Sequence, residues 1–134
     1  MLTINEMPDH ARVWVYQCNR DLQDVEIAEI NRKAAVFLME WTSHGEWMKA
    51  SLTVLYHRFI VVAVDEEHAR ASGCGIDKSV RFIQQLEQDY SVSLFDRLTT
   101  AYRDEKGNIC TMRLPDFEKL ATAGKVNGDT IVFN

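Results

Sequence analysis

The spacing of hydrophobic residues changes along the chain, and the first two patterns predict a strand followed by a helix. Residues 11–18 include four apolar residues in a row at 13–16, which is typical of a central strand that is buried on both faces. Asp21 suits the N-cap of a helix that ends near His44 and Gly45. The apolar positions of this helix recur at three- and four-residue steps and are Ile27, Ile30, Ala34, Phe37, Leu38 and Trp41.

Two further strands are predicted after this helix. Alternation over residues 50–56 indicates a strand with one drier face, and the run 59–64 indicates a continuous apolar strand. His57 and Arg58 between them are poor residues for a tight hairpin turn. Residues 65–75 are polar and small, so we expect a loop there.

The second half of the chain predicts one long helix and then a group of smaller elements. A clear helical stripe runs from Ile76 to Tyr90, with Asp77 at its start as the N-cap. The remaining predictions are strands over 94–103 and 109–113, a short helix over 115–123 and a last strand over 129–134.

The predicted order of elements is β-α-β-β-α-β followed by β-α-β. The first six match the split β-α-β pattern of ferredoxin-like folds, in which two helices cover one face of an antiparallel sheet. We therefore expect an α+β protein that forms a single domain over residues 1–134. Its ferredoxin-like core would carry a C-terminal β-α-β extension that lengthens the sheet or covers an edge.

The composition is that of an ordinary globular protein. The chain has 134 residues, of which 46% are hydrophobic and 26% charged, and this balance argues against disorder. Lys and Arg number 15 against 20 Asp and Glu, so the net charge is −5, which disfavours a nucleic-acid partner. Three widely spaced cysteines do not suggest a disulfide framework. Without a secretory leader or an apolar run of roughly 20 residues, we expect a cytoplasmic location and no membrane partner.

Familiar catalytic and cofactor motifs are absent from the sequence. It contains no G-x-x-x-x-G-K-[ST], H-E-x-x-H, C-x-x-C or G-x-S-x-G, and its four histidines share no metal-ligand spacing. The run 65–68 offers carboxylates and a histidine to a divalent ion, but an acidic run after a strand is more typical of a solvated loop. We therefore expect neither a cofactor nor a metal site.

The segment 72–79 is the most specific candidate site. Two glycines flank a cysteine at the start of a helix, where backbone N–H groups and the helix dipole favour an anion. Lys78 and Arg81 add positive charge if they face the same way. The candidate ligand-binding residues are Trp41, Ser72, Gly73, Gly75, Asp77, Lys78, Ser79 and Arg81.

The same segment allows two other interpretations. As a thiol site, Cys74 would be the nucleophile, and His44 near the end of the preceding helix would be its base. As a purely structural turn, the glycines permit a tight loop, Asp77 caps the helix and Cys74 packs as a small apolar residue.

Four segments of the chain resemble a family of short bacterial proteins of uncharacterised activity. They are Trp41-x-x-His44-Gly45, the run from Arg58 to Asp65, the run from Ser72 to Val80 and the closing stretch from Phe117 to Phe133. The Ser-Gly-Cys-x-Ile-Asp core is the most specific, and members often have Ser where this chain has Gly75. Some members carry the label "ABC transporter ATPase", which a chain without a phosphate loop and its lysine does not support. The resemblance therefore implies no activity, but it directs attention to the segments around His44 and Cys74.

We interpret the chain as a small binding or regulatory module with an anion or small-molecule site at residues 72–79. The alternative is a thiol-dependent enzyme or redox-responsive protein that uses Cys74. A third interpretation is a structural subunit that forms a homodimer through an exposed sheet edge.

Overall fold

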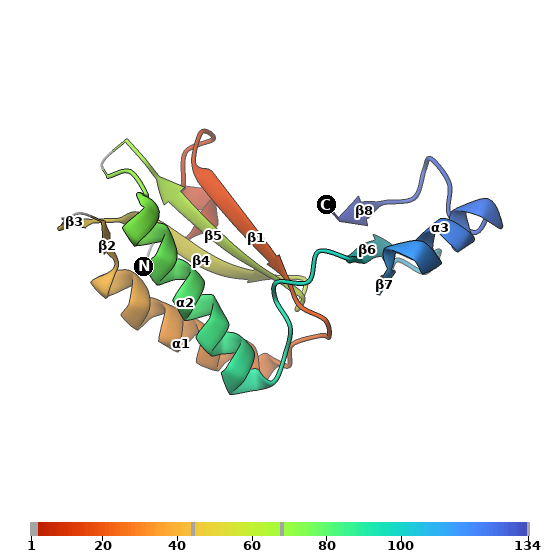
Figure 1. Cartoon of the computed structure of the whole chain (residues 1–134), viewed down its shortest axis with the longest axis horizontal. Helices are drawn as coiled ribbons and strands as arrows, with labels where there is room; N and C mark the ends of the chain where they lie inside the picture. The colour runs from red at the N-terminus through yellow and green to blue at the C-terminus, as the bar shows by residue number, and fades with distance from the viewer. Residues whose placement is uncertain (1–2, 44, 68, 134) are drawn as a thin grey trace. The chain divides into compact units, whose positions relative to one another are not determined.

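A computed structural model of the chain describes residues 3–43, 45–67 and 69–133 (Figure 1). It contains α-helices and antiparallel strands, so the predicted α+β class is confirmed. The chain divides into two compact units, Met1–Phe95 and Asp96–Asn134, and each is described by itself. Within the described residues, the helices all lack the length and apolar character that crossing a membrane requires.

The first unit contains two long helices and a sheet. Its elements in chain order are η1 (Ile4–Glu6), β1 (Arg12–Gln17), α1 (Asp24–Glu40), β2 (Thr42–Ser43), β3 (Glu46–Trp47), β4 (Lys49–Leu55), β5 (Phe59–Asp65) and α2 (Gly73–Tyr90). The prediction of strands over 50–56 and 59–64 is confirmed by β4 and β5.

The main sheet of this unit is antiparallel and has the strand order β1-β5-β4. β5 is the central strand, and all seven of its residues are buried, as a continuous apolar run predicts. β1 and β4 both pair antiparallel with β5 and therefore run parallel to each other, with α1 as their connection. This is the split β-α-β arrangement.

The prediction that residues 11–18 form a central strand was wrong. Among the described residues, β1 pairs only with β5 and so lies at an edge of the sheet. Tyr16 is buried on the core side, whereas Val13 and Val15 are 47% and 56% exposed. Apolar residues on both faces thus did not indicate burial of both faces, because exposed valines are common on protein surfaces.

Among the residues that the structure describes, no fourth strand of a ferredoxin-like sheet lies beside β1. In that fold the strand after the second helix completes the sheet of the first three. Here the strand after α2 is β6 (Thr99–Arg103), which lies between β7 (Ile109–Arg113) and β8 (Val132–Phe133) in another sheet. Because β6 already has a strand on each side, the complete ferredoxin-like sheet of the prediction is not confirmed.

Both long helices cover the same face of the β1-β5-β4 sheet (Figure 1). Phe37 of α1 stacks on Trp41 and on Phe82 of α2, with ring centroids 5.2 and 4.5 Å apart. Each fully buried Ile or Leu of this core stabilises the fold by about 1.5–3 kcal/mol. The most deeply buried core residues are Cys18, Leu22, Ile30, Ala34, Trp41, Ile60, Val62, Val64, Ile83 and Leu86.

Each long helix begins at a residue other than the predicted one. α1 has Gln23 as its N-cap instead of Asp21, and the Glu26 carboxylate accepts the Gln23 N–H at 2.9 Å. α2 has Ser72 as its N-cap instead of Asp77, and the Ser72 hydroxyl accepts the Gly75 N–H at 3.4 Å. A serine that satisfies a first-turn N–H starts the helix upstream of both glycines.

The hairpin between β4 and β5 closes with Tyr56 and His57 in the left-handed region, at φ 54 and 57. Non-glycine residues pay roughly 1–2 kcal/mol each in this region. Contacts from elsewhere in the chain hold the turn: the His57 carbonyl accepts the Leu22 N–H at 2.6 Å, and the His57 ring pairs with Asp24 at 2.9 Å. The poor turn sequence is therefore compensated by tertiary contacts.

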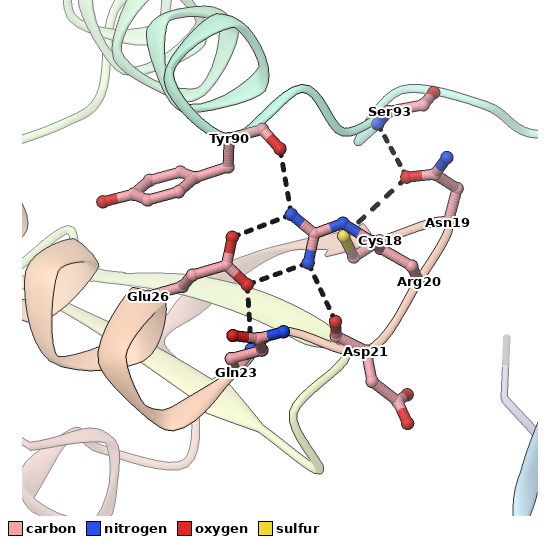
Figure 2. Close-up of polar contacts among 8 residues, drawn as sticks. All are labelled: Cys18, Asn19, Arg20, Asp21, Gln23, Glu26, Tyr90 and Ser93. Atoms are coloured by element: carbon pink, nitrogen blue, oxygen red, sulfur yellow. Dashed lines mark hydrogen bonds and ion pairs between the residues drawn. The ribbon is translucent and has the colours of Figure 1, made fainter.

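Arg20 closes the end of the helical layer where α1 begins and α2 ends (Figure 2). Its guanidinium donates to both carboxylate oxygens of Glu26 at 2.8 Å and to the Tyr90 carbonyl at 2.9 Å. The hydrogen bonds from Arg20, followed by the one from the Gln23 N–H, lower the pKa of Glu26 from 4.5 to about 2. The Glu26 carboxylate therefore stays ionised, and Arg20 links it, on α1, to the Tyr90 carbonyl on α2.

The second unit, Asp96–Asn134, contains β6, β7, α3 (Leu114–Thr122) and β8. Tyr102 of β6 is buried and contacts the Phe117 ring of α3, with centroids 5.4 Å apart. The predicted strand over 94–103 begins only at Thr99, because the Asp96 carboxylate accepts the Leu98 N–H at 2.8 Å and forms a local turn.

Candidate functional site

A pocket of about 1120 Å³ opens in the first unit where β1 begins, β5 ends and α2 begins. We call it the α2 pocket. Eight of its nine lining residues are polar or charged, so it differs from the apolar core beneath the helices. The lining residues are His10, Arg12, Ser43, Glu46, Glu66, Glu67, Arg70, Ala71 and Ser72.

Two contacts between elements bring these residues together. The antiparallel pairing of β1 and β5 places Arg12 opposite Val64, so the residues before β1 meet those after β5. The Ser43 hydroxyl accepts the Ser72 N–H at 3.2 Å and joins β2 to the start of α2. The pocket is therefore a product of the sheet register and of how α2 docks.

The end of α1 and the start of α2 are in close contact beside this pocket. Trp41 is buried, and its indole N–H donates to the Gly75 carbonyl at 2.9 Å. A Cβ on Gly75 would lie 3.1 Å from both the Cβ and the Oγ of Ser43. Gly75 thus lets two chain segments approach, which is a packing role for this part of the predicted site.

Several other residues of the predicted site bond within the protein. The Lys78 ammonium donates to the carbonyl and hydroxyl oxygens of Thr42 at 3.1 and 3.3 Å. Ser79 is buried, and its hydroxyl donates to the Ile76 carbonyl at 2.7 Å. The Arg81 guanidinium donates to the Asp77 carbonyl at 3.4 Å on an exposed face of α2.

Of the predicted ligand-binding residues, Ser72 is the one that lines the α2 pocket. Trp41 and Gly75 hold the start of α2 from beneath, and Lys78 fastens it to Thr42. Gly73 has open space around it, with no atom within 4 Å of an added Cβ.

The predicted thiol pair is only partly described. Cys74 is exposed on the first turn of α2. His44 lies outside the described residues, so its relation to Cys74 stays a prediction. The other two cysteines differ in exposure, since Cys18 is buried in the core and Cys110 is half-buried.

Acidic and basic side chains contact each other at the pocket. The Arg12 guanidinium lies 3.7 Å from one oxygen of Glu66, and the other oxygen of Glu66 accepts the Ala71 N–H at 3.1 Å. The His10 imidazole lies 3.2 Å from a Glu67 oxygen and 3.8 Å from an Asp65 oxygen. Glu66 therefore holds Arg12 in place, and His10 lies next to the carboxylates of Glu67 and Asp65.

Sequence reasoning missed His10, Arg12 and Arg70 as pocket residues. They are scattered polar residues that no motif joins, whereas the run 65–68 offers carboxylates and a histidine in one short segment. The pairing of the first strand with the strand 59–64 is the signal that would have placed His10 beside Asp65. That pairing depends on strand order, which the periodicity does not provide.

No family model, no curated protein and no solved structure matches the chain. The resemblance to the short bacterial family therefore stays a prediction.

Proposed function

We propose that the chain is a small binding module whose ligand is a small anion held in the α2 pocket. One observation carries the proposal: Arg12, Arg70 and the start of an 18-residue helix meet at a cavity large enough for a small molecule. The proposal moves the predicted anion site from the first turns of α2 to the residues just before it.

The helix contributes part of the attraction. The first N–H groups of an α-helix lack partners within the helix and carry partial positive charge. α2 has no acidic residue in its first turn, so its own side chains do not neutralise that charge there. Phosphate and carboxylate groups bind at such helix starts.

The two arginines add full charges from separate elements. Arg70 lies in the segment between β5 and α2, and it has no ion-pair partner among the described residues. Arg12 stands at the start of β1 and is held at the pocket by Glu66. Guanidinium groups are well suited to phosphate and carboxylate because their planar donors match two oxygens at once.

Titration of the full chain with inorganic phosphate tests this function. Saturable binding and a raised unfolding midpoint are expected, because a ligand that binds only the folded state stabilises it. Arg70→Ala should lower phosphate affinity at least ten-fold. The matched control is Arg32→Ala, which removes the same charge from an exposed position of α1 and should leave affinity unchanged. No saturable binding, or an equal loss in both variants, contradicts the proposal.

A second candidate function uses the Cys74 thiol, and the observation that favours it is the exposure of this side chain. The test measures the rate of thiol modification against pH for the full chain and for glutathione, with Cys74→Ser as the control. A reactive site requires Cys74 to react faster than glutathione at neutral pH. A Cys74 profile that coincides with the glutathione profile removes this candidate.

Self-association through β1 stays the third prediction. Among the described residues β1 pairs only with β5, so it is an edge strand, and a strand-to-strand dimer would form through the backbone of such an edge. The mass of the full chain in solution tests it, and a monomer at all concentrations would rule it out.

A further inference from the structure

We propose that His10, Asp65 and Glu67 form a binding site for one divalent transition-metal ion at the rim of the α2 pocket. Each residue offers one ligand atom, and the three atoms lie within 4.8 Å of one another. This inference adds a second ligand to the pocket and does not depend on the anion.

The spacing of the three donor atoms suits a metal ion. Zinc bonds to histidine nitrogen and carboxylate oxygen are about 2.0–2.1 Å long, so tetrahedral ligand atoms stand about 3.3 Å apart. The His10 Nε2 lies 3.2 Å from a Glu67 oxygen and 3.8 Å from an Asp65 oxygen. Small side-chain adjustments would therefore bring all three donors to bonding distance of one ion.

The backbone holds this arrangement from two directions. His10 stands before β1, where the Ala11 N–H donates to the Pro8 carbonyl at 2.9 Å and forms a turn. Asp65 ends β5, and its Oδ1 accepts the Glu67 N–H at 3.1 Å. The two carboxylates thus belong to one local turn that the sheet places next to His10.

Asp65 is the anchor of the proposed site. Its side chain is only 5% exposed, whereas those of His10 and Glu67 are 57% and 69% exposed. A buried carboxylate is costly unless positive charge faces it. Lys49 supplies positive charge at 3.6 Å from Oδ2, and Oδ1, which accepts the Glu67 N–H, is the oxygen that lies 3.8 Å from the His10 Nε2.

The donor set indicates the class of metal. One imidazole nitrogen and two carboxylate oxygens suit Zn²⁺, Mn²⁺ or Fe²⁺ better than Ca²⁺, which takes oxygen ligands in larger number. Three protein ligands leave at least one coordination position open. That position would face the pocket, because His10 and Glu67 both line it.

The test titrates Zn²⁺ into the full chain and into four single variants. His10→Gln and Glu67→Gln alter exposed side chains, so both variants should fold, and each should lower Zn²⁺ affinity at least ten-fold. His57→Gln is the matched histidine control, because His57 is also 57% exposed and also pairs with a carboxylate. Cys74→Ser controls for metal binding by an exposed thiol.

One Zn²⁺ per chain, with losses confined to His10→Gln and Glu67→Gln, is the expected result. The site is overturned if the unaltered chain binds no Zn²⁺, or if His57→Gln or Cys74→Ser abolishes binding while His10→Gln does not. Arg70→Ala separates this inference from the proposed function, because it should weaken phosphate binding and leave the Zn²⁺ titration unchanged.

Discussion

The two ends of the helical layer in the first unit are built in different ways. Where α1 begins and α2 ends, Arg20 bonds to Glu26 and to the Tyr90 carbonyl in a closed network (Figure 2). Where α1 ends and α2 begins, the indole of Trp41 holds the Gly75 carbonyl, and a charged pocket opens beside the contact.

The difference lies in what the polar groups bond to. The Glu26 carboxylate is matched by the Arg20 guanidinium and by the Gln23 N–H, so this end has a structural explanation for its charges. At the pocket, carboxylates and arginines gather around open space at a helix start. The pocket differs because its charged groups also line open space, which is the setting in which polar groups can bind a ligand.

The first prediction concerns Trp41, the buried side chain that joins the end of α1 to the start of α2. Trp41→Ala deletes a fully buried ring that contacts Phe37 and the start of α2, and such changes cost about 3–5 kcal/mol. The free energy of unfolding from urea titration should fall by this amount. A loss below about 1 kcal/mol would show that Trp41 is not needed to hold the start of α2 in place.

The second prediction compares the stability of alanine variants at Gly75 and Gly73, the two glycines in the first turn of α2. Gly75→Ala places a Cβ 3.1 Å from Ser43, and overpacking of this kind costs about 1–3 kcal/mol. Gly73→Ala meets no atom within 4 Å and should leave stability unchanged or slightly higher. Equal effects in the two variants, measured by thermal unfolding, would contradict the packing role of Gly75.

The third prediction concerns how the stability of the fold depends on pH at the end of the helical layer where Arg20 bonds to Glu26. The folded-state pKa of Glu26, about 2, lies below its ordinary value of 4.5, so ionisation of this group stabilises the fold. That stability is fully present above pH 4.5 and is lost as the pH falls through about 2. Glu26→Gln should cost about 1.5 kcal/mol at pH 7, and the gap to the unaltered chain should narrow on acidification. Glu105→Gln, in an exposed turn, is the control and should show neither effect.

The fourth prediction has the smallest expected effect and tests whether Lys78 holds α2 in place or binds the anion. Lys78→Ala removes hydrogen bonds to Thr42 and should lower stability by about 0.5–1 kcal/mol. Phosphate affinity should fall less than in Arg70→Ala, because Lys78 is outside the pocket lining. A larger fall in phosphate affinity for Lys78→Ala would return the anion site to the first turns of α2.

The elements were largely predictable because each leaves a local pattern. The stripe at Ile30, Ala34 and Trp41 indicated the buried face of α1, and the apolar run from Phe59 indicated the strand β5, although not its central place in the sheet. The missed start of α2 at Ser72 was also a local feature, since a serine three residues before a glycine N–H is an ordinary N-cap.

The site was predictable only in part. The segment 72–79 does border the α2 pocket, but Ser72 alone of its residues lines it. His10, Arg12 and Arg70 come from positions that no short motif joins. Their meeting depends on the register of β1 against β5 and on the contact between Ser43 and Ser72.

Local patterns were enough to predict the α+β class, the two long helices and the strands β4 and β5, because hydrophobic period is a local property of the chain. The tertiary structure decided that β1 is an edge strand, that β6 has its neighbours in β7 and β8, and that His10 faces Asp65. These outcomes depend on which strands pair, and one strand can satisfy its backbone hydrogen bonds with any of several partners. The choice among them rests on the packing of the whole chain, so the candidate chemistry became visible only in three dimensions.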